Sequence, residues 1–173
     1  LRCAPRAPDC AACPVADHCL AAGRGETSRF PELAPRRKTV SVEDVAVLVR
    51  RDGDIVLTRR PDGGHWAGLW ELPRVRRAEG EPLHAAARRA ASEVCGLVVE
   101  SPEPFGAIRH SVTHYRIRLH GFEAARLSGE LAPITCSDAR WVDSADLREY
   151  ALSSPQRRLL ELAHGDDAHA RLF

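Results

Sequence analysis

The six cysteines of this 173-residue chain are distributed unevenly, and their placement restricts what the chain can fold into. Four of them lie in one short N-terminal segment: Cys3, Cys10, Cys13 and Cys19. An extracellular disulfide framework would spread paired cysteines through the whole fold. Four neighbouring thiols instead predict a metal ion or an inorganic cluster in a reducing compartment. The two isolated residues, Cys95 and Cys136, are interpreted as small buried hydrophobic side chains.

The spacing of the four cysteines narrows the kind of site. The gaps are six, two and five residues. Zinc sites usually present two short Cys-x2-Cys pairs, and this segment has only one, Cys10-x2-Cys13. Four thiolates in so short a segment need a positive partner, which an iron–sulfur cluster or a zinc ion supplies.

Composition excludes some classes of protein and leaves others open. Hydrophobic residues make up 44% of the chain and charged residues 28%, which predicts an ordinary globular domain. The net charge of +1 gives no electrostatic case for nucleic acid over the chain as a whole. Local basic runs such as Arg36-Arg37-Lys38 are interpreted either as solvated surface or as phosphate contacts on one side of the molecule.

No segment of the sequence has the character of a membrane or secretion signal. No apolar run approaches the roughly 20 residues that a membrane helix needs, and no apolar stretch follows the opening Leu1-Arg2-Cys3. The chain contains no Met, including at its start. We therefore expect it to be a piece of a longer protein.

Strand and helix signals alternate over residues 43–165, which predicts an α/β domain. A linker rich in Pro and basic residues is expected over 30–42, and a loose tail over 166–173. Residues 45–49 and 55–58 are short apolar runs, and Asp52-Gly53 between them favours a hairpin. A third short strand is expected over 69–72, where Pro73 ends it.

The helix expected over residues 82–95 is the most regular feature. Pro82 suits its first position and Gly96 its C-terminal cap. One apolar stripe runs along it at three-to-four spacing: Leu83, Ala86, Ala87, Ala90, Ala91 and Val94.

Strand and helix signals return in the last third of the chain. Residues 114–120 alternate strictly, which predicts a half-buried strand whose outer face carries His114, Arg116, Arg118 and His120. Another strand is expected at 140–142. A final helix is expected to begin near Ser153-Ser154-Pro155-Gln156, with Leu159, Leu160 and Leu162 on it.

The cysteine segment resembles the iron–sulfur loop of the endonuclease III and MutY superfamily of DNA glycosylases. The match comprises the four spacings together with Arg6, Pro8 and Pro14. The resemblance implies a 4Fe–4S cluster that braces a DNA-binding loop and does no redox work on the base. It also implies that Cys3, Cys10, Cys13 and Cys19 are the ligands and that Arg6 contacts DNA phosphate.

Residues 81–97 resemble a Nudix box that has lost its metal ligands. With its second glycine at Gly96, the box places its first Glu at Glu81 and its Arg at Arg89. The three later glutamates, which hold Mg²⁺ in Nudix hydrolases, fall at Ala90, Glu93 and Val94. One carboxylate cannot hold that metal. The resemblance therefore implies a Nudix-like fold, a mixed sheet with flanking helices, without pyrophosphate hydrolysis.

A cysteine cluster followed by such a domain is the domain order of the MutY family of adenine DNA glycosylases, and the resemblance covers residues 1 to about 164. Residues 68–73, Gly-Leu-Trp-Glu-Leu-Pro, match a segment of that family. Residues 110–114 resemble its loop that approaches 8-oxoguanine: His110, Ser111, Val112, Thr113 and His114. By this resemblance Thr113 reads the base, Val112 wedges beside it in place of the family's Phe, and His114 contacts phosphate. The alternative is a strand-edge loop whose polar residues satisfy backbone groups.

The family removes adenine mispaired with 8-oxoguanine by hydrolysing its glycosidic bond. The family's catalytic Glu and Asp lie in a helical domain upstream of the cluster, so we assign no catalytic residue and expect this chain alone to be inactive. Double-stranded DNA carrying the 8-oxoguanine·adenine mispair is the expected partner, without a membrane, for a monomer in the bacterial cytoplasm. The alternatives are an active Nudix nucleotide pyrophosphohydrolase and a zinc-bearing nucleic-acid-binding module.

Overall fold

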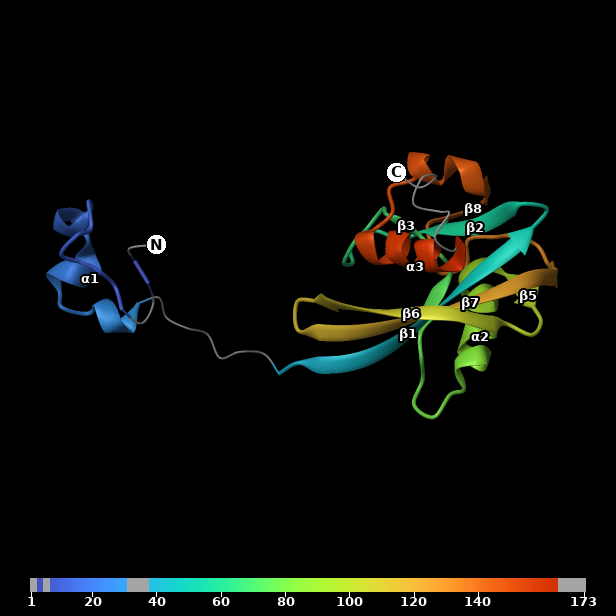
Figure 1. Ribbon diagram of the computed structural model, residues 1–173, viewed down its shortest axis with the longest axis horizontal. Coiled ribbons are helices and arrows are strands. Elements are labelled where there is room, and N and C mark those ends of the chain that lie inside the picture. The colour runs from blue at the N-terminus through green and yellow to red at the C-terminus, as the bar shows by residue number, and fades with distance from the viewer. Residues whose placement is uncertain (1–2, 5–6, 31–37, 165–173) are drawn as a thin grey trace. The chain divides into compact units, whose positions relative to one another are not determined.

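The computed structural model describes residues 3–4, 7–30 and 38–164 and divides the chain into two compact units, Leu1–Lys38 and Thr39–Phe173. The tail expected over 166–173 and most of the expected linker, residues 31–37, lie outside the described residues. Figure 1 shows the two units, each of which is considered by itself. Among the described helices, none is both long and apolar enough to cross a membrane.

The first unit consists of short helical turns. They are η1 (Ala16–His18), α1 (Leu20–Gly23) and η2 (Thr27–Arg29), and none of the three contains a buried residue. Backbone hydrogen bonds join the turns, such as Cys13 N to Cys10 O at 3.2 Å and Cys19 N to Ala16 O at 3.0 Å. Because these helices bury no side chain, hydrophobic packing alone gives this unit little stability.

The second unit is built on one mixed sheet. Its strands are β1 (Val40–Arg51), β2 (Asp54–Arg59), β3 (Trp70–Glu71), β4 (Arg74–Arg76), β5 (Leu97–Val99), β6 (Glu103–Val112), β7 (Tyr115–Gly129) and β8 (Asp138–Asp143). The central order is β3-β2-β1-β7-β5, with β4 paired to β1, β6 to β7 and β8 to β2. The long β1–β7 pair is parallel, and the other named strand pairs are antiparallel.

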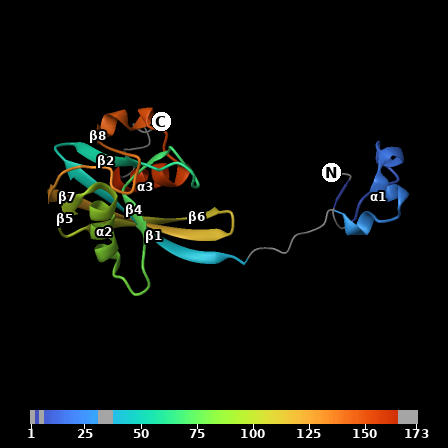
Figure 2. The same cartoon turned by 180° about the vertical axis from the view of Figure 1, so that it is seen from behind.

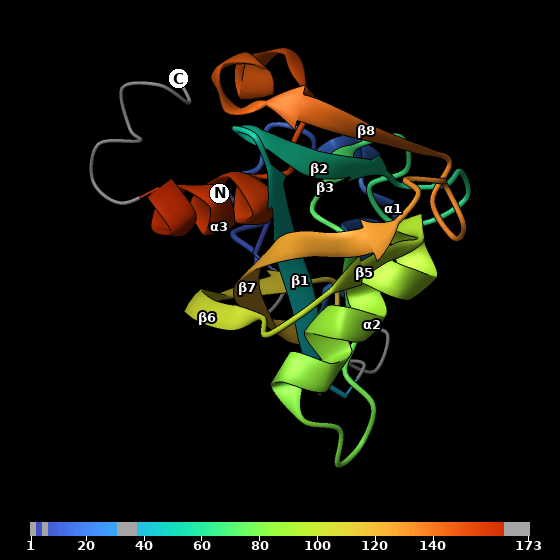
Figure 3. The same cartoon turned by 90° about the vertical axis from the view of Figure 1, so that its right-hand side faces the viewer.

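Two helices cover opposite faces of this sheet, as Figure 3 shows. Helix α2 (Leu83–Cys95) packs its buried alanines against Val45, Val47 and Val49 of β1. On the other face, Leu159 and Leu160 of α3 (Ser154–His164) pack with Ala46 and Leu48 of the same strand. Successive residues of a strand point to opposite faces, so β1 contributes to both cores. A 3-10 helix, η3 (Ser144–Glu149), lies between β8 and α3.

The predicted hairpin and the predicted central helix are both present. Strands β1 and β2 pair with Arg51 opposite Asp54, and both residues of the intervening turn have positive φ, 51° at Asp52 and 95° at Gly53. Helix α2 ends at Gly96, whose φ of 73° is the left-handed C-cap that its position predicts. Pro82 is the N-cap rather than the first helical residue, because its ψ of 139° is extended.

The strand predicted over 114–120 differs from the structure in two respects. His114 lies in the turn before β7, and β7 continues far past residue 120 to Gly129. His120 is buried, with 8% of its surface exposed, so it was wrongly assigned to the outer face. The reason is that β7 passes beside α2 from this point on, where Phe122 and Ala124 join the core on that side.

The expected linker needs correction, whereas the predicted final helix is present as α3. Strand β1 begins at Val40, inside the 30–42 segment, because Val40 to Val42 pair with Tyr115 to Ile117 of β7. On α3, Leu159 and Leu160 are fully buried, whereas Leu162 is 47% exposed. The short strands predicted at 69–72 and 140–142 are present as β3 and β8.

Candidate functional site

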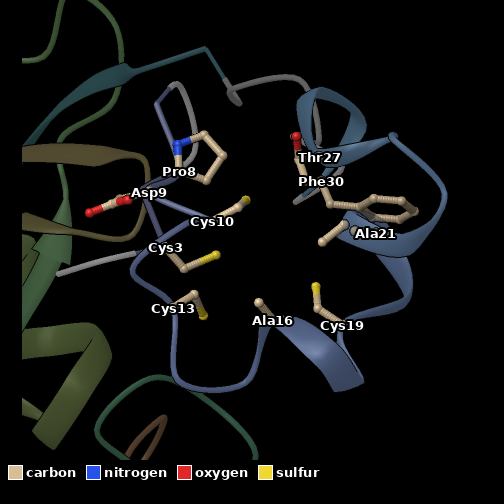
Figure 4. Close-up of a pocket in the computed structure, with 11 residues that line it drawn as sticks. Cys3, Pro8, Asp9, Cys10, Cys13, Ala16, Cys19, Ala21, Thr27 and Phe30 are labelled. Atoms are coloured by element: carbon tan, nitrogen blue, oxygen red, sulfur yellow. The ribbon is translucent and has the colours of Figure 1, made fainter.

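The four clustered cysteines line one small cavity in the first unit. Its volume is about 290 Å³, and most of the rest of its lining is apolar, including Pro8, Ala16, Ala21 and Phe30. All four cysteines are free thiols. Figure 4 shows them bordering the same hollow from separate turns of the chain. Four thiols that border one largely apolar hollow could serve as ligands of a metal ion or an inorganic cluster.

The four thiols border the hollow and do not meet at one point. Within the described residues, no three His, Cys, Asp or Glu side chains are placed to hold one metal ion. A zinc ion requires sulfur atoms at about 2.3 Å from one point. In an iron–sulfur cluster the thiolates bind the irons of a larger group, so they line a hollow rather than meet at a point. Arg6, the expected phosphate contact of this segment, lies outside the described residues.

Helix α2 lacks two of the three carboxylates that a Nudix metal site requires. Ala90 and Val94 occupy two of those positions, and their side chains are buried in the core, 0% and 7% exposed. Glu93 occupies the third, is exposed, and pairs with Arg89 at 3.1 Å. A single exposed carboxylate already engaged by a guanidinium is a poor magnesium site.

Arg89 and Glu81 tie the loop that precedes α2 to the helix. Two guanidinium nitrogens of Arg89 donate to the two oxygens of Glu81, at 2.8 and 2.9 Å, and one also donates to the carbonyl of Arg76 at 2.8 Å. The hydrogen bonds from Arg89 and from the Ala78 amide lower the pKa of the Glu81 carboxyl to about 2. This pair preserves the shape of the box although the metal carboxylates are missing.

The predicted lesion loop forms the tip of the β6–β7 hairpin. Thr113 and His114 are the two turn residues, between Val112 and Tyr115, which pair with each other. Thr113 has a φ of 52°, which is unusual for a β-branched residue. Its hydroxyl donates to the carbonyl of Val112 at 2.7 Å. Thr113 is exposed, and the ring of His114 lies 4.2 Å from that of Tyr115.

Donation to Val112 determines what Thr113 can offer a ligand. The hydroxyl proton is engaged inside the turn, so the oxygen keeps lone-pair capacity to accept. The base-reading role that the resemblance implies for Thr113 stays a prediction, and the structure places this residue at the exposed tip of the hairpin. Ser111 is also exposed, whereas Val112 is half-buried.

His110 occupies a different environment from the rest of this loop. Its ring lies 5.7 Å from the ring of Trp66, and both ring nitrogens are buried without a hydrogen-bond partner in the described structure. Burial, with the nearby Arg74 guanidinium, lowers the pKa of this imidazole. Trp66 was missed by the sequence reasoning. Trp66 and His110 are 44 positions apart, so no local pattern in the sequence could reveal that their rings lie close together. The only local signal was the tryptophan itself, which lies two residues after Gly64.

A family model and several known proteins match this chain, and the family match lies within the second unit. The family model described as NUDIX domain matches residues 44–162. The chain is 28% identical to the CTP pyrophosphohydrolase of Escherichia coli over 120 residues, which cover 69% of this chain and 89% of that protein. It is 25% identical to the adenine DNA glycosylase of Rattus norvegicus over 140 residues, covering 77% of this chain and 27% of that protein.

Solved structures give the same architecture. The solution structure of the E. coli ORF135 protein matches with a TM-score of 0.63 at 25% identity, covering 76% of this chain and 93% of that one. The MutT NUDIX hydrolase of Burkholderia pseudomallei matches with a TM-score of 0.62 at 21% identity, covering 71% and 98%. The chain thus spans about a quarter of the glycosylase and nearly all of the single-domain hydrolases.

Proposed function

Because this chain belongs to the Nudix domain family, yet α2 carries Ala90 and Val94 where metal carboxylates are needed, we propose that it binds DNA and recognises 8-oxoguanine as part of an adenine DNA glycosylase. The burial of those two side chains carries the proposal. A Nudix fold that cannot assemble its magnesium site is free for recognition without hydrolysis. The similarity to adenine DNA glycosylases supports the choice of DNA as the partner.

Excision of adenine opposite 8-oxoguanine is proposed for the whole protein rather than for this chain. The chain spans about a quarter of the rat glycosylase, and we assign no catalytic residue to it. Its proposed task is to hold the lesion strand while a helical domain hydrolyses the glycosidic bond of adenine. For this task the reader is the hairpin tip, residues 110–114, with Arg6 as a further phosphate contact.

The hydroxyl of Thr113 supplies the proposed discrimination. Guanine presents N7 as an acceptor, whereas 8-oxoguanine presents N7–H as a donor. An oxygen whose own proton is donated to Val112 can accept from the lesion and gains nothing from guanine. A hydrogen bond of this kind separates the two bases by about 1–2 kcal/mol.

We expect the full chain to bind a duplex with 8-oxoguanine·adenine more tightly than the same duplex with guanine·adenine, and Thr113→Val to remove that preference. Valine has the same shape and branching, so the substitution removes the acceptor and the hydroxyl's bond to Val112 while leaving the rest of the side chain in place. The expected loss is about five- to thirtyfold in the ratio of the two dissociation constants. Equilibrium anisotropy at fixed salt measures it.

Thr135→Val is the matched control, because Thr135 is an exposed threonine outside the hairpin. It should leave the ratio unchanged. Equal binding of the two duplexes by the unaltered chain, or an unchanged ratio in Thr113→Val, would contradict the assignment of the reader.

The second part of the proposal is that the thiol cavity holds a 4Fe–4S cluster, with Cys3, Cys10, Cys13 and Cys19 as ligands. The cavity fits such a group, since it is bordered by four free thiols and its remaining lining is mostly apolar. Bound there, the cluster would supply cross-links that the first unit otherwise lacks.

Chain purified without oxygen is expected to contain about four iron atoms and four acid-labile sulfides. Cys13→Ser should lower both contents, because it removes one of the four ligands. Cys136→Ser should lower neither, since Cys136 belongs to the other unit. Elemental analysis decides, and zinc without iron would favour the zinc-bearing module instead.

The competing function is pyrophosphate hydrolysis of a nucleotide. It is favoured by the 28% identity to the CTP pyrophosphohydrolase over 89% of that protein. Magnesium-dependent release of phosphate or pyrophosphate from CTP, lost in Glu93→Gln, would support it against the recognition proposal. A rate of CTP hydrolysis no higher than that of a reaction without protein would contradict the hydrolase function.

A further inference from the structure

The central sheet extends beyond the cover provided by α2. The core on the α2 face begins at Val45 of β1, whereas the strand itself begins five residues earlier, at Val40. The β6–β7 hairpin runs alongside this free end of β1, as Figures 1 and 2 show from opposite sides. A second cavity of about 530 Å³ lies on this part of the sheet.

Strand register assembles a set of polar side chains there. On β6 and β7, Arg109 is opposite Arg118 and Ser111 is opposite Arg116. On β1 and β7, Ser41 is beside Arg116 and Glu43 is beside Arg118. Paired residues in neighbouring strands point to the same face. We call the exposed members of this set the arginine face: Ser41, Arg109, Ser111, Arg116 and Arg118.

The charge of this face is not balanced within the described structure. Arg109, Arg116 and Arg118 make no ion pair among the described residues. The carboxylate that lines the same cavity, Glu43, is already bound by Arg77 and lies 3.1 Å from the ring of His120. Those two hydrogen bonds lower the pKa of Glu43 and keep it ionised. Directly opposed like charges destabilise a sheet, so an external anion would stabilise the arrangement.

We infer that the arginine face binds consecutive phosphates of a duplex DNA backbone. This inference rests on the proposed recognition of DNA by the neighbouring hairpin tip. Arg116 and Arg118 are two residues apart on one strand, about 6.6 Å along it, so their side chains can reach successive anions along the strand direction. The serine hydroxyls add neutral donors. Thr113 at the tip is only three residues from Arg116, which brings base reading and phosphate binding together.

The test is a salt series with the full chain and two duplexes, one with the lesion and one undamaged. Each lost phosphate contact lowers the slope of log affinity against log salt by about 0.9. Replacing Arg109, Arg116 and Arg118 together by Gln should therefore lower the slope by about 2–3 and weaken binding to both duplexes at least tenfold at about 0.15 M salt. The preference for the lesion duplex should survive.

Two control variants make the outcome specific. The triple Lys variant keeps the charge and should keep most of the slope. Arg148→Gln removes an exposed arginine from η3, away from this face, and should change nothing. Circular dichroism of each variant confirms that the sheet is retained, as expected for exposed side chains.

The results also separate the two proposals. Suppose that the triple Gln variant has a lower salt slope but the unaltered chain shows no preference for the lesion duplex. This result would support the arginine face and contradict the assignment of Thr113 as the reader. An unchanged slope in the triple Gln variant, or no binding of either duplex by the unaltered chain, would overturn the arginine face. Displacement of the duplex by micromolar CTP would also overturn it, because the face would then hold a free nucleotide.

Discussion

Gly121→Val is expected to lower the free energy of unfolding of the second unit by about 2–3 kcal/mol. Gly121 is buried on β7. A Cβ atom there would lie 2.3 and 2.5 Å from ring atoms of Phe105 and 2.9 Å from a methyl of Leu159. Leu159 is fully buried and cannot withdraw without opening the α3 core. Valine adds two methyl groups to that conflict. Urea unfolding followed by circular dichroism measures the change.

Gly64→Val is the matched control for this substitution. Gly64 is exposed, and a Cβ built there meets no atom within 4 Å. Its variant should unfold within about 0.5 kcal/mol of the unaltered chain. If Gly121→Val unfolded at the same urea concentration as this control, the close packing of β6, β7 and α3 would be incorrect.

Arg89→Ala is expected to cost about 2 kcal/mol near pH 7. The substitution leaves the Glu81 carboxylate, 15% exposed, with only the Ala78 amide from its former pair of partners. It also frees the carbonyl of Arg76 and removes the bond to Glu93. This expected cost is smaller than that of breaking a fully buried ion pair, because the Arg89 side chain is 30% exposed and solvent weakens the interaction.

The same pair predicts how stability changes with pH. The pKa of Glu81 is about 2 in the fold, below its ordinary value of 4.5. A lowered carboxyl pKa contributes stability that is complete above pH 4.5 and is lost as the pH falls toward 2. The difference between the unaltered chain and Arg89→Ala should therefore shrink over that interval. A difference that stayed constant would mean that the effect of Arg89 is not electrostatic.

Arg88→Ala serves as the control for Arg89→Ala. Arg88 is the neighbouring residue on α2 and is exposed. Its removal changes the net charge equally, so it should neither destabilise the unit by more than about 0.5 kcal/mol nor alter the pH profile.

Local chemistry made some elements predictable. Asp52-Gly53 specifies a two-residue turn because both positions tolerate positive φ, and the hairpin of β1 and β2 follows. Gly96 ends α2 for the same reason, and the three-to-four spacing of its alanines identifies the buried face. Burial of Ala90 and Val94, at two carboxylate positions of the box, was therefore foreseeable from the stripe.

Other parts depended on contacts that the sequence does not encode locally. By alternation, His120 was assigned to the outer face of a half-buried strand, yet it is buried because α2 covers that stretch of β7. The sequence places Leu159, Leu160 and Leu162 on α3, and only the fold shows that Leu159 and Leu160 are buried while Leu162 is 47% exposed. The hairpin tip was located by resemblance, whereas the packing of His110 beneath Trp66 required the fold.

The sequence by itself determined the cysteine cluster, the turns, the central helix and the loss of two carboxylates, because each depends on residues within a few positions of one another. Only the tertiary structure decided which residues join Arg116 and Arg118 in the arginine face. Glu43 and His120 are 77 positions apart, and the parallel pairing of β1 with β7 brings them and their neighbours together. Residues so distant meet only when a sheet fixes the register of its strands, and register depends on burial over both faces at once.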